Sequence, residues 1–325
     1  MNSCSSNLRS RRGDEADRAD GSRNNPPPHV GGYESTRRCR PLLGTFVEIT
    51  AQWSAGLRPG SLSHVAGSTP DRRSALQDAV NAAFAAIEHI QNLLSAHDEA
   101  SELSRLNREA ALRPVAVSRE TFEVLRRAMR LAKESGGAFD CTVAPKLARW
   151  GLRPANLKRK NPGNWRDVQL LRGRKVRFLR PLALDLGGIA KGYAVDAAIG
   201  VLRSHGVRAA VVNAGGDLRM FGSQPAMIHL RHPAQPQAFT HTFSLHEGAL
   251  ATSSPCFTER DWRGQRVSHL VNSSNGEAII GNVSVTVRAR ECWLADALTK
   301  VVLNAPRRAK RLLAKYEAEA FMLAA

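Results

Sequence analysis

The chain has 325 residues, of which 42% are hydrophobic and 23% charged, so it can bury a sizeable core as one large domain or two. Its formal net charge of +18 favours anionic ligands. No basic stripe with interleaved aromatic residues accompanies this charge, so we expect no nucleic-acid partner. Five cysteines at wide, irregular spacing, without a CxxC pair, argue against a zinc site and a disulfide framework.

Residues Met1 to Arg38 are polar, charged and rich in proline and glycine. Such a segment buries too little apolar surface to order itself, so we predict a disordered polar tail over 1–38 and a folded domain over 39–325. The N-terminus lacks the apolar region of a secretory signal, and no apolar run reaches the roughly 18 residues of a membrane span. As written, the chain is expected to be soluble and cytoplasmic, without an export signal.

The first half of the domain shows strand and helix patterns in turn. Alternating side chains predict a strand within Pro41–Gln52, followed by a Gly/Ser/Pro loop over 57–68. Thr69 can cap a long amphipathic helix that runs to Leu94. A second amphipathic helix is predicted over 121–134, and a strand over 175–179.

The central stretch, Leu184 to Gly222, places one helix between two glycine turns. The pattern predicts a strand end, a turn at Gly187-Gly188, a helix over 190–204, a β-branched run to Val212 and a second turn at Gly215-Gly216. Glycine lets the backbone approach a ligand closely, and amides at a helix start favour phosphate oxygens. We therefore expect a diphosphate-bearing ligand here, although glycine pairs beside helices also serve as plain turns.

The last third alternates short strands with helices. Strands are predicted over 227–230, 239–245, 283–289 and 318–323, and helices over 291–303 and 306–316. Together with the earlier elements they predict an α+β fold in which layered sheets and packed helices surround one cleft.

Several blocks, taken in order, resemble the FAD:protein FMN transferases of the ApbE family. They are LGT (43–45), SELSRLN (101–107), GAFDCTV (137–143), WG (150–151), DLGGIAKGYAVD (185–196), VNAGGDLRMFG (212–222), ATS with SHLVN (within 251–272) and VTVRARECWLADALTK (285–300). The resemblance extends over roughly residues 40 to 305. One glycine turn is weak as a signature, whereas this ordered set is specific.

The resemblance implies a T-fold-like α+β architecture, with mixed or antiparallel sheets around an FAD cleft. It also implies a Mg²⁺-dependent transfer, in which a threonine of an acceptor flavoprotein attacks the pyrophosphate of FAD, takes FMN and releases AMP. A metal ion and backbone amides can neutralise the charge that develops as such a bond breaks. A membrane redox subunit is one candidate acceptor, and relatives are commonly periplasmic or lipid-anchored at the inner membrane.

The same resemblance assigns roles to individual positions. The cofactor contacts would be Leu43, His97, Ala138, Phe139, Asp140, Trp150, Gly151, Asp185, Lys191 and His269. The metal positions would be the Gly188 carbonyl, Asp296, Thr299 and Lys300, and the catalytic pair would be His269 and Asp296. A histidine can titrate near neutral pH, and a carboxylate is a hard ligand suited to Mg²⁺. Asp217 is as compatible with a turn-stabilising role as with a functional one.

Four positions depart from the family pattern. Leu43 replaces a methionine, His97 replaces an aromatic residue, and Asn272 replaces an aspartate. At the fourth, Lys300 stands where a threonine or serine would ligate the metal four residues after Asp296, and Thr299 lies about 100° away around the helix. Either Thr299 reaches the ion, or the Lys300 ammonium supplies part of its charge and weakens Mg²⁺ dependence.

Two other functions remain open. Water could replace the threonine, giving an FAD pyrophosphatase that yields FMN and AMP, or the chain could bind flavin without catalysis.

Overall fold

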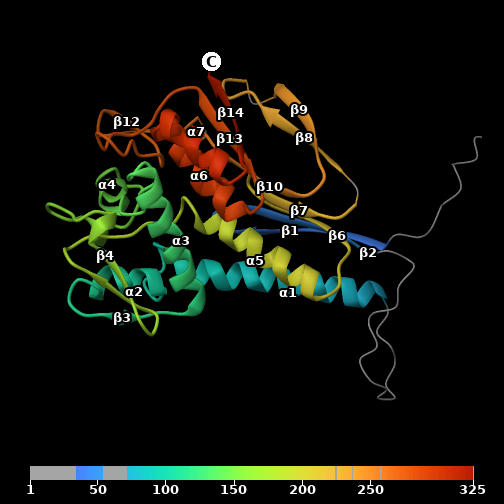
Figure 1. Ribbon diagram of the computed structural model, residues 1–325, viewed down its shortest axis with the longest axis horizontal. Helices are drawn as coiled ribbons and strands as arrows, with labels where there is room; N and C mark the ends of the chain where they lie inside the picture. The colour runs from blue at the N-terminus through green and yellow to red at the C-terminus, as the bar shows by residue number, and fades with distance from the viewer. Residues whose placement is uncertain (1–33, 54–71, 224, 236, 257, 325) are drawn as a thin grey trace, which may run out of the picture. The chain divides into compact units, whose positions relative to one another are not determined.

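The computed structural model describes residues 34–53 and 72–324, except 224, 236 and 257 (Figure 1). Its main sheet has seven strands in the order β1-β2-β6-β7-β10-β13-β14. In the described part of the chain, every pairing within this sheet is antiparallel. The strands are β1 Glu34–Leu42, β2 Thr45–Trp53, β6 Ala209–Ala214, β7 Asp217–Phe221, β10 Gly248–Ser253, β13 Val283–Ala289 and β14 Glu319–Ala324.

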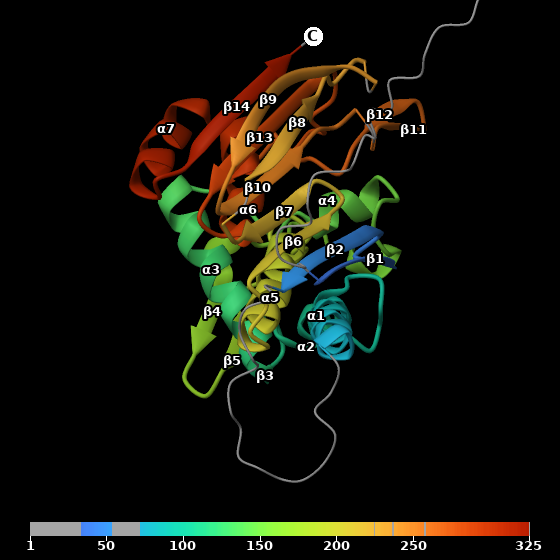
Figure 2. The same ribbon diagram turned by 90° about the vertical axis from the view of Figure 1, so that its right-hand side faces the viewer.

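Three helices cover one face of this sheet, namely α1 Arg72–Leu94, α5 Ala190–Ser204 and α6 Cys292–Asn304. α1 packs on β1 and β2, α5 on β6 and β7, and α6 on β10 and β13. α1 and α5 lie side by side, as both views show (Figures 1 and 2). The predicted helix over 190–204 is therefore confirmed, and it occupies the centre of the helical layer.

The core between sheet and helices follows from the sequence periodicities. Alternate residues of β2, Val47 and Ile49 among them, are fully buried, and so are Val80, Phe84 and Ile87 of α1. A period of two in the strand and of three to four in the helix turns both apolar faces toward each other. Full burial of each such side chain contributes about 1.5–3 kcal/mol.

The opposite face of the sheet is partly covered by a hairpin of β8 Ala226–Arg231 and β9 Phe239–Leu245 (Figure 2). Val212 of β6 faces the helices, whereas its neighbour Val211 packs in a separate apolar cluster with Leu245 of the hairpin. The ring of Phe243 stacks on Phe321 of β14 at a centroid distance of 5.5 Å. The middle of the sheet is thus enclosed on both sides.

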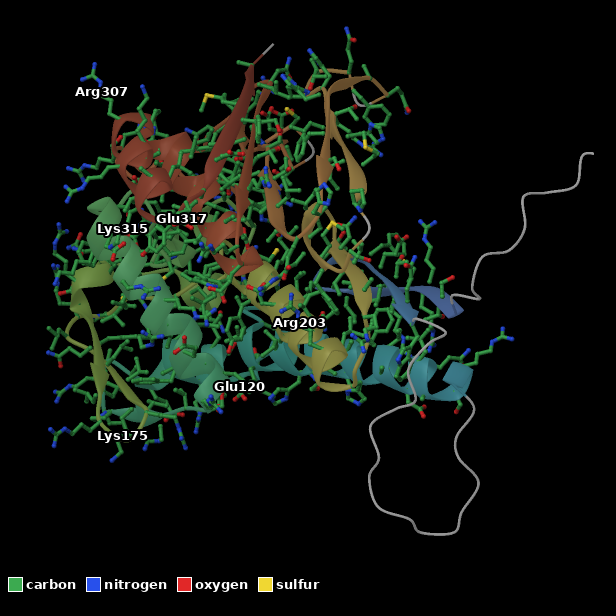
Figure 3. All side chains as sticks on the ribbon, turned by 45° about the vertical axis from the view of Figure 1, so that its right-hand side comes forward. Glu120, Lys175, Arg203, Arg307, Lys315 and Glu317 are labelled. Carbon is green, nitrogen blue, oxygen red and sulfur yellow. The ribbon has the colours of Figure 1, made fainter. Side chains whose placement is uncertain are left out.

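The remaining elements flank these layers. They include four helices, α2 Glu102–Glu109, α3 Arg119–Ser135, α4 Ala144–Arg149 and α7 Pro306–Lys315. Two 3₁₀ turns, Ala155–Leu157 and Trp165–Asp167, follow α4 in the chain. The small sheets are β3 Val115–Ala116, β5 Lys175–Phe178 and β4 Val168–Leu171, and the hairpin β11 Arg260–Trp262 with β12 Gln265–Val267. Arg307 of α7 and Lys175 of β5 project outward (Figure 3), so this share of the positive charge faces solvent.

The α+β prediction is confirmed, and the named strands of the described residues pair antiparallel, one of the two expected arrangements. The predicted tail needs one correction, because its last five residues, 34–38, form the start of β1 and pair with β2. The rest of that tail and the loop over 57–68 lie outside the described residues. Among the described residues, no helix is both long and apolar enough to cross a membrane.

Candidate active site

A cleft of about 1350 Å³ opens where the two glycine turns meet the ends of α1 and α6 and the β8 strand. Pockets for drug-sized ligands measure about 300–1,000 Å³, so this one can take an extended ligand. The structure brings ten of the expected site residues to its wall: Leu43, His97, Ala138, Phe139, Asp140, Asp185, Gly188, Lys191, His269 and Lys300. Trp150, Gly151, Asp296 and Thr299 are not among the described residues that line it.

The first glycine turn, Gly187-Gly188, is positioned by hydrogen bonds to the backbone of Leu184 and Asp185, shortly before it in the chain. The side chain of Asn107, on α2, donates to the Leu184 carbonyl at 3.0 Å and accepts from the Leu184 amide at 2.7 Å. The next amide, of Asp185, donates to the Cys141 carbonyl at 2.7 Å. Because Asn107 satisfies both backbone groups of a buried residue, it sets the position of the turn. Sequence reasoning missed this role, although Asn107 closes the SELSRLN block.

Asp185 lies at the centre of a charged network on this turn. Its Oδ1 accepts from the Gly187 amide at 2.7 Å, and its Oδ2 forms an ion pair with the Arg153 guanidinium. Nη1 of Arg153 also lies 3.4 Å from Nδ1 of His269. Arg153 thus joins the two expected cofactor contacts. No sequence signal points to Arg153 beyond the basic segment that follows Trp150-Gly151.

Two histidines of the cleft have lowered pKa values. Burial is the largest cause for both His97 and His269, and the nearby positive charge of Arg153 lowers the pKa of each ring further. Both rings are therefore neutral at pH 7, and a neutral imidazole can accept a proton. For Asp140, burial raises the pKa, although the Thr142 amide and hydroxyl donate to its Oδ1 at 2.8 and 2.7 Å.

The second glycine turn leads into a buried ion pair. Gly215 and Gly216 have φ values of +63° and +100°, a region that favours glycine, and Asp217 follows them. Asp217 pairs with Lys191 of α5 and is only 1% exposed. Burial raises the pKa of Asp217, while Lys191 opposes that shift. Burial lowers the pKa of Lys191, but Asp217 and Asp296 outweigh this and raise it above its ordinary value. The lysine therefore stays charged.

α6 carries the expected metal ligands, but their donor atoms are already engaged. Asp296 is fully buried, and its Oδ2 accepts from the Gly192 amide at 3.2 Å. Nζ of Lys300 forms an ion pair with Oδ1 of Asp296 and donates to the Asp296 carbonyl at 3.0 Å. The Thr299 hydroxyl donates to the same carbonyl at 2.6 Å and lies 2.7 Å from the Ser253 hydroxyl.

This donor set does not fit a resident divalent cation. Lys300 covers the cleft side of Asp296, and Thr299 is fully buried on another side of the helix. A Cβ placed on Gly188 would lie 3.3 Å from Cε of Lys300, so the lysine stem also occupies the space over the Gly188 backbone. Elsewhere in the described residues, no group of three or more His, Cys, Asp or Glu side chains could hold a metal.

α6 meets α5 at a close backbone contact. A Cβ on Gly192 would overlap with the Cys292 carbonyl, so only glycine fits there. Asp196, one turn further along α5, accepts from the amides of Cys292 and Trp293, both at 2.9 Å, and pairs with Arg219 at 2.7 Å. A carboxylate at a helix N-terminus satisfies free amides and complements the dipole. Sequence reasoning missed this anchor, which positions Asp296.

Trp150 and Gly151 contact the β11–β12 hairpin instead of the cleft. The Trp262 ring lies over Gly151, where a Cβ would overlap with it, and its Nε1 donates to the Arg149 carbonyl at 3.0 Å. Arg260 donates to the carbonyls of Gly151 and Trp150 at 2.6 and 3.2 Å. A segment expected to contact the cofactor directly therefore supports the hairpin that leads to His269.

Fold and site together define an antiparallel α+β protein with one extended cleft, lined by glycine turns and charged side chains. The model of the ApbE family matches residues 43–322. The FAD:protein FMN transferase of Vibrio cholerae is 30% identical over 232 residues, which cover 65% of this chain and 69% of that protein. The chain belongs to the ApbE family.

Solved structures agree with this assignment. The ApbE protein of Thermotoga maritima superimposes with a TM-score of 0.74 at 25% identity, covering 89% of this chain and 94% of its own. The flavin transferase ApbE of Vibrio cholerae gives a TM-score of 0.70 at 25% identity, covering 90% and 94%.

Proposed function

We propose that this chain moves FMN from FAD onto a threonine of an acceptor flavoprotein and releases AMP. Family membership makes the chain an enzyme, and its relatives carry the name FAD:protein FMN transferase, a transferase of a phosphorus-containing group. The observation that supports the proposal best is the Asp185–Arg153–His269 network beside the first glycine turn, on the wall of a cleft large enough for a dinucleotide.

The proposed step exchanges one phosphorus–oxygen bond for another. The threonine oxygen attacks the FMN-side phosphorus of the FAD diphosphate, and the bond to the bridging oxygen breaks. AMP leaves with that oxygen and its electron pair, and the hydroxyl proton passes to His269. A ring held neutral by burial and by Arg153 can accept it.

Charged side chains at the cleft wall support this chemistry. Arg153, Lys191 and Lys300 all reach the cleft, where cations can neutralise the diphosphate and the leaving AMP. The family resemblance implies Mg²⁺ as cofactor, but the side-chain oxygens of Asp296 and Thr299 are already engaged by Lys300, Gly192 and Ser253, so no part of the step is assigned to a metal.

The test is to incubate the purified chain with FAD and a candidate acceptor, such as a membrane redox subunit that carries an exposed threonine. We expect ultraviolet fluorescence of the acceptor band in a denaturing gel and one AMP per label. Replacement of the acceptor threonine by valine should abolish both signals. Free FMN and AMP without label would indicate a pyrophosphatase instead, and unchanged FAD would indicate flavin binding alone.

The matched variant is His269→Gln, which keeps a polar side chain but removes the proton acceptor. It should lower the transfer rate about 100-fold or more, since general base catalysis contributes about 10²–10⁴-fold. An unchanged rate would remove His269 from the mechanism.

A further inference from the structure

We propose that the ε-ammonium of Lys300 takes the place of a divalent cation in this site, so that the chain works without a metal bound to Asp296. The catalytic part of this inference rests on the proposed function. The exclusion of the metal is a property of the folded chain and can be measured separately.

The geometry of α6 presents an ammonium, not a carboxylate, to the ligand. Residues four apart lie on one helix face, so Lys300 extends over Asp296. Asp296 is fully buried and does not line the cleft, whereas Lys300 does. A phosphate that enters would therefore meet a positive charge at the position where relatives would have a bound metal.

Lys300 retains a free donor for such a phosphate. An ammonium has three N–H groups. Within the described residues, two of them are taken by Oδ1 and the main-chain carbonyl of Asp296. The third remains for the cleft, and because both partners belong to the same helix, the ammonium is held in place before any ligand binds.

The surrounding charges are already balanced. Asp217 forms an ion pair with Lys191 and Asp296 forms one with Lys300, so each of these buried carboxylates already has one ammonium partner. A divalent cation would add two further positive charges and would have to displace the Lys300 ammonium. Thr299 offers the cation no ligand, because the Thr299 hydroxyl is engaged by Ser253 and by the Asp296 carbonyl.

The first measurement uses Mn²⁺ without FAD, because the diphosphate of FAD itself binds metal. Electron paramagnetic resonance reports free Mn²⁺ directly. The unaltered chain should leave Mn²⁺ free, whereas Lys300→Thr should bind one ion, and Asp296→Asn added to that variant should release it again. Binding of one Mn²⁺ per unaltered chain, lost in Asp296→Asn alone, would overturn the proposal.

The second measurement is AMP release with EDTA or with Mg²⁺. The unaltered chain should keep its rate in EDTA within about threefold, and Lys300→Met should lose about 100-fold, the typical effect of removing one electrostatic contact to a transition state. Lys300→Thr should work only with Mg²⁺, and its recovery there shows that the fold survives. A rate of the unaltered chain that EDTA abolishes and Mg²⁺ restores contradicts the proposal. Absence of AMP under every condition contradicts the proposed function, while the Mn²⁺ result still decides the inference.

Discussion

The glycine-turn segment, 184–217, and helix α6, 292–304, each hold one buried aspartate that pairs with a lysine, but they do so differently. Asp217 pairs with Lys191 across two elements, from the start of β7 to α5. Asp296 pairs with Lys300 of its own helix, one turn away. The first pair joins two elements, so it contributes to placing β7 against α5. The second pair lies within one helix, so a change of its cation removes no contact between elements.

The two regions meet at Gly192, where the amide donates to Oδ2 of Asp296. The absence of a side chain there lets α5 approach the first residue of α6. The glycine-turn segment therefore positions α6, and Lys300 of α6 supplies a cation that faces the ligand. Of the variants below, Gly192→Val tests the position of α6, and Thr299→Val tests whether α6 uses Lys300 or a metal.

The largest effect is expected for Gly192→Val, because the new side chain would overlap with the backbone of Cys292, which cannot rotate away. Overpacking of this kind costs about 3 kcal/mol of unfolding free energy, and urea denaturation measures it. The matched control is Gly200→Ala in the same helix, where a Cβ would meet nothing within 4 Å. That change should stabilise the chain by about 0.5–1 kcal/mol. Equal urea midpoints for both variants would mean that α5 and α6 are not held by this contact.

The next prediction concerns how the rate of AMP release depends on pH. Arg153 lowers the pKa of His269, in addition to the larger effect of burial. The histidine must be neutral to accept a proton, so the rate of AMP release falls as pH drops through its pKa. Arg153→Gln removes the positive charge, raises the pKa and should move the acid limb of the pH–rate profile to higher pH. The rate itself should fall about 10-fold or more through the lost cation.

The control for this change is Arg113→Gln, since Arg113 is exposed and pairs with Glu109 of α2. Its pH profile should match that of the unaltered chain. An acid limb of Arg153→Gln that stays in place would show that a group other than His269 controls the rate.

Local pattern predicted the helix between the two glycine turns, since α5 spans the expected residues 190–204. The family resemblance, not the pattern, named Asp185, Gly188, Lys191 and Lys300, and the structure brings these four residues to one cleft. What the sequence could not give are contacts between distant segments. Nothing local pairs Asn107 with Leu184, or turns the Thr299 hydroxyl toward Ser253.

The same limit explains the misplaced contacts. Trp150-Gly151 was expected at the cofactor, but the direction of that segment is set by Trp262, more than a hundred residues later in the chain. In the folded chain a bulky ring over Gly151 turns the segment toward the hairpin. Only the three-dimensional arrangement shows that Arg153, two residues on, is the one that reaches the cleft.

Thr299→Val tests whether α6 uses its own hydroxyl for function. Valine matches the shape of threonine but leaves the buried Ser253 hydroxyl without this partner. We expect a loss of about 1–3 kcal/mol in unfolding free energy, seen as a lower melting temperature, with kcat unchanged within about threefold because the hydroxyl does not reach the cleft. Ser253→Ala should give a similar loss of stability. A 100-fold loss of kcat in a stable Thr299→Val protein would make Thr299 a ligand and favour a metal over Lys300.

The smallest effect on activity is expected for Trp150→Phe, because Trp150 contacts the β11–β12 hairpin and not the cleft. Its KM for FAD should stay within about twofold, and its stability should fall by less than about 1.5 kcal/mol, as for a modest change of shape in an apolar cluster. His97→Ala is the contrasting variant, since His97 lines the cleft at the end of α1 and should raise the KM about 10-fold by the loss of one ligand contact. A larger KM change in Trp150→Phe than in His97→Ala would place the flavin against the hairpin and reverse the order of these two contacts.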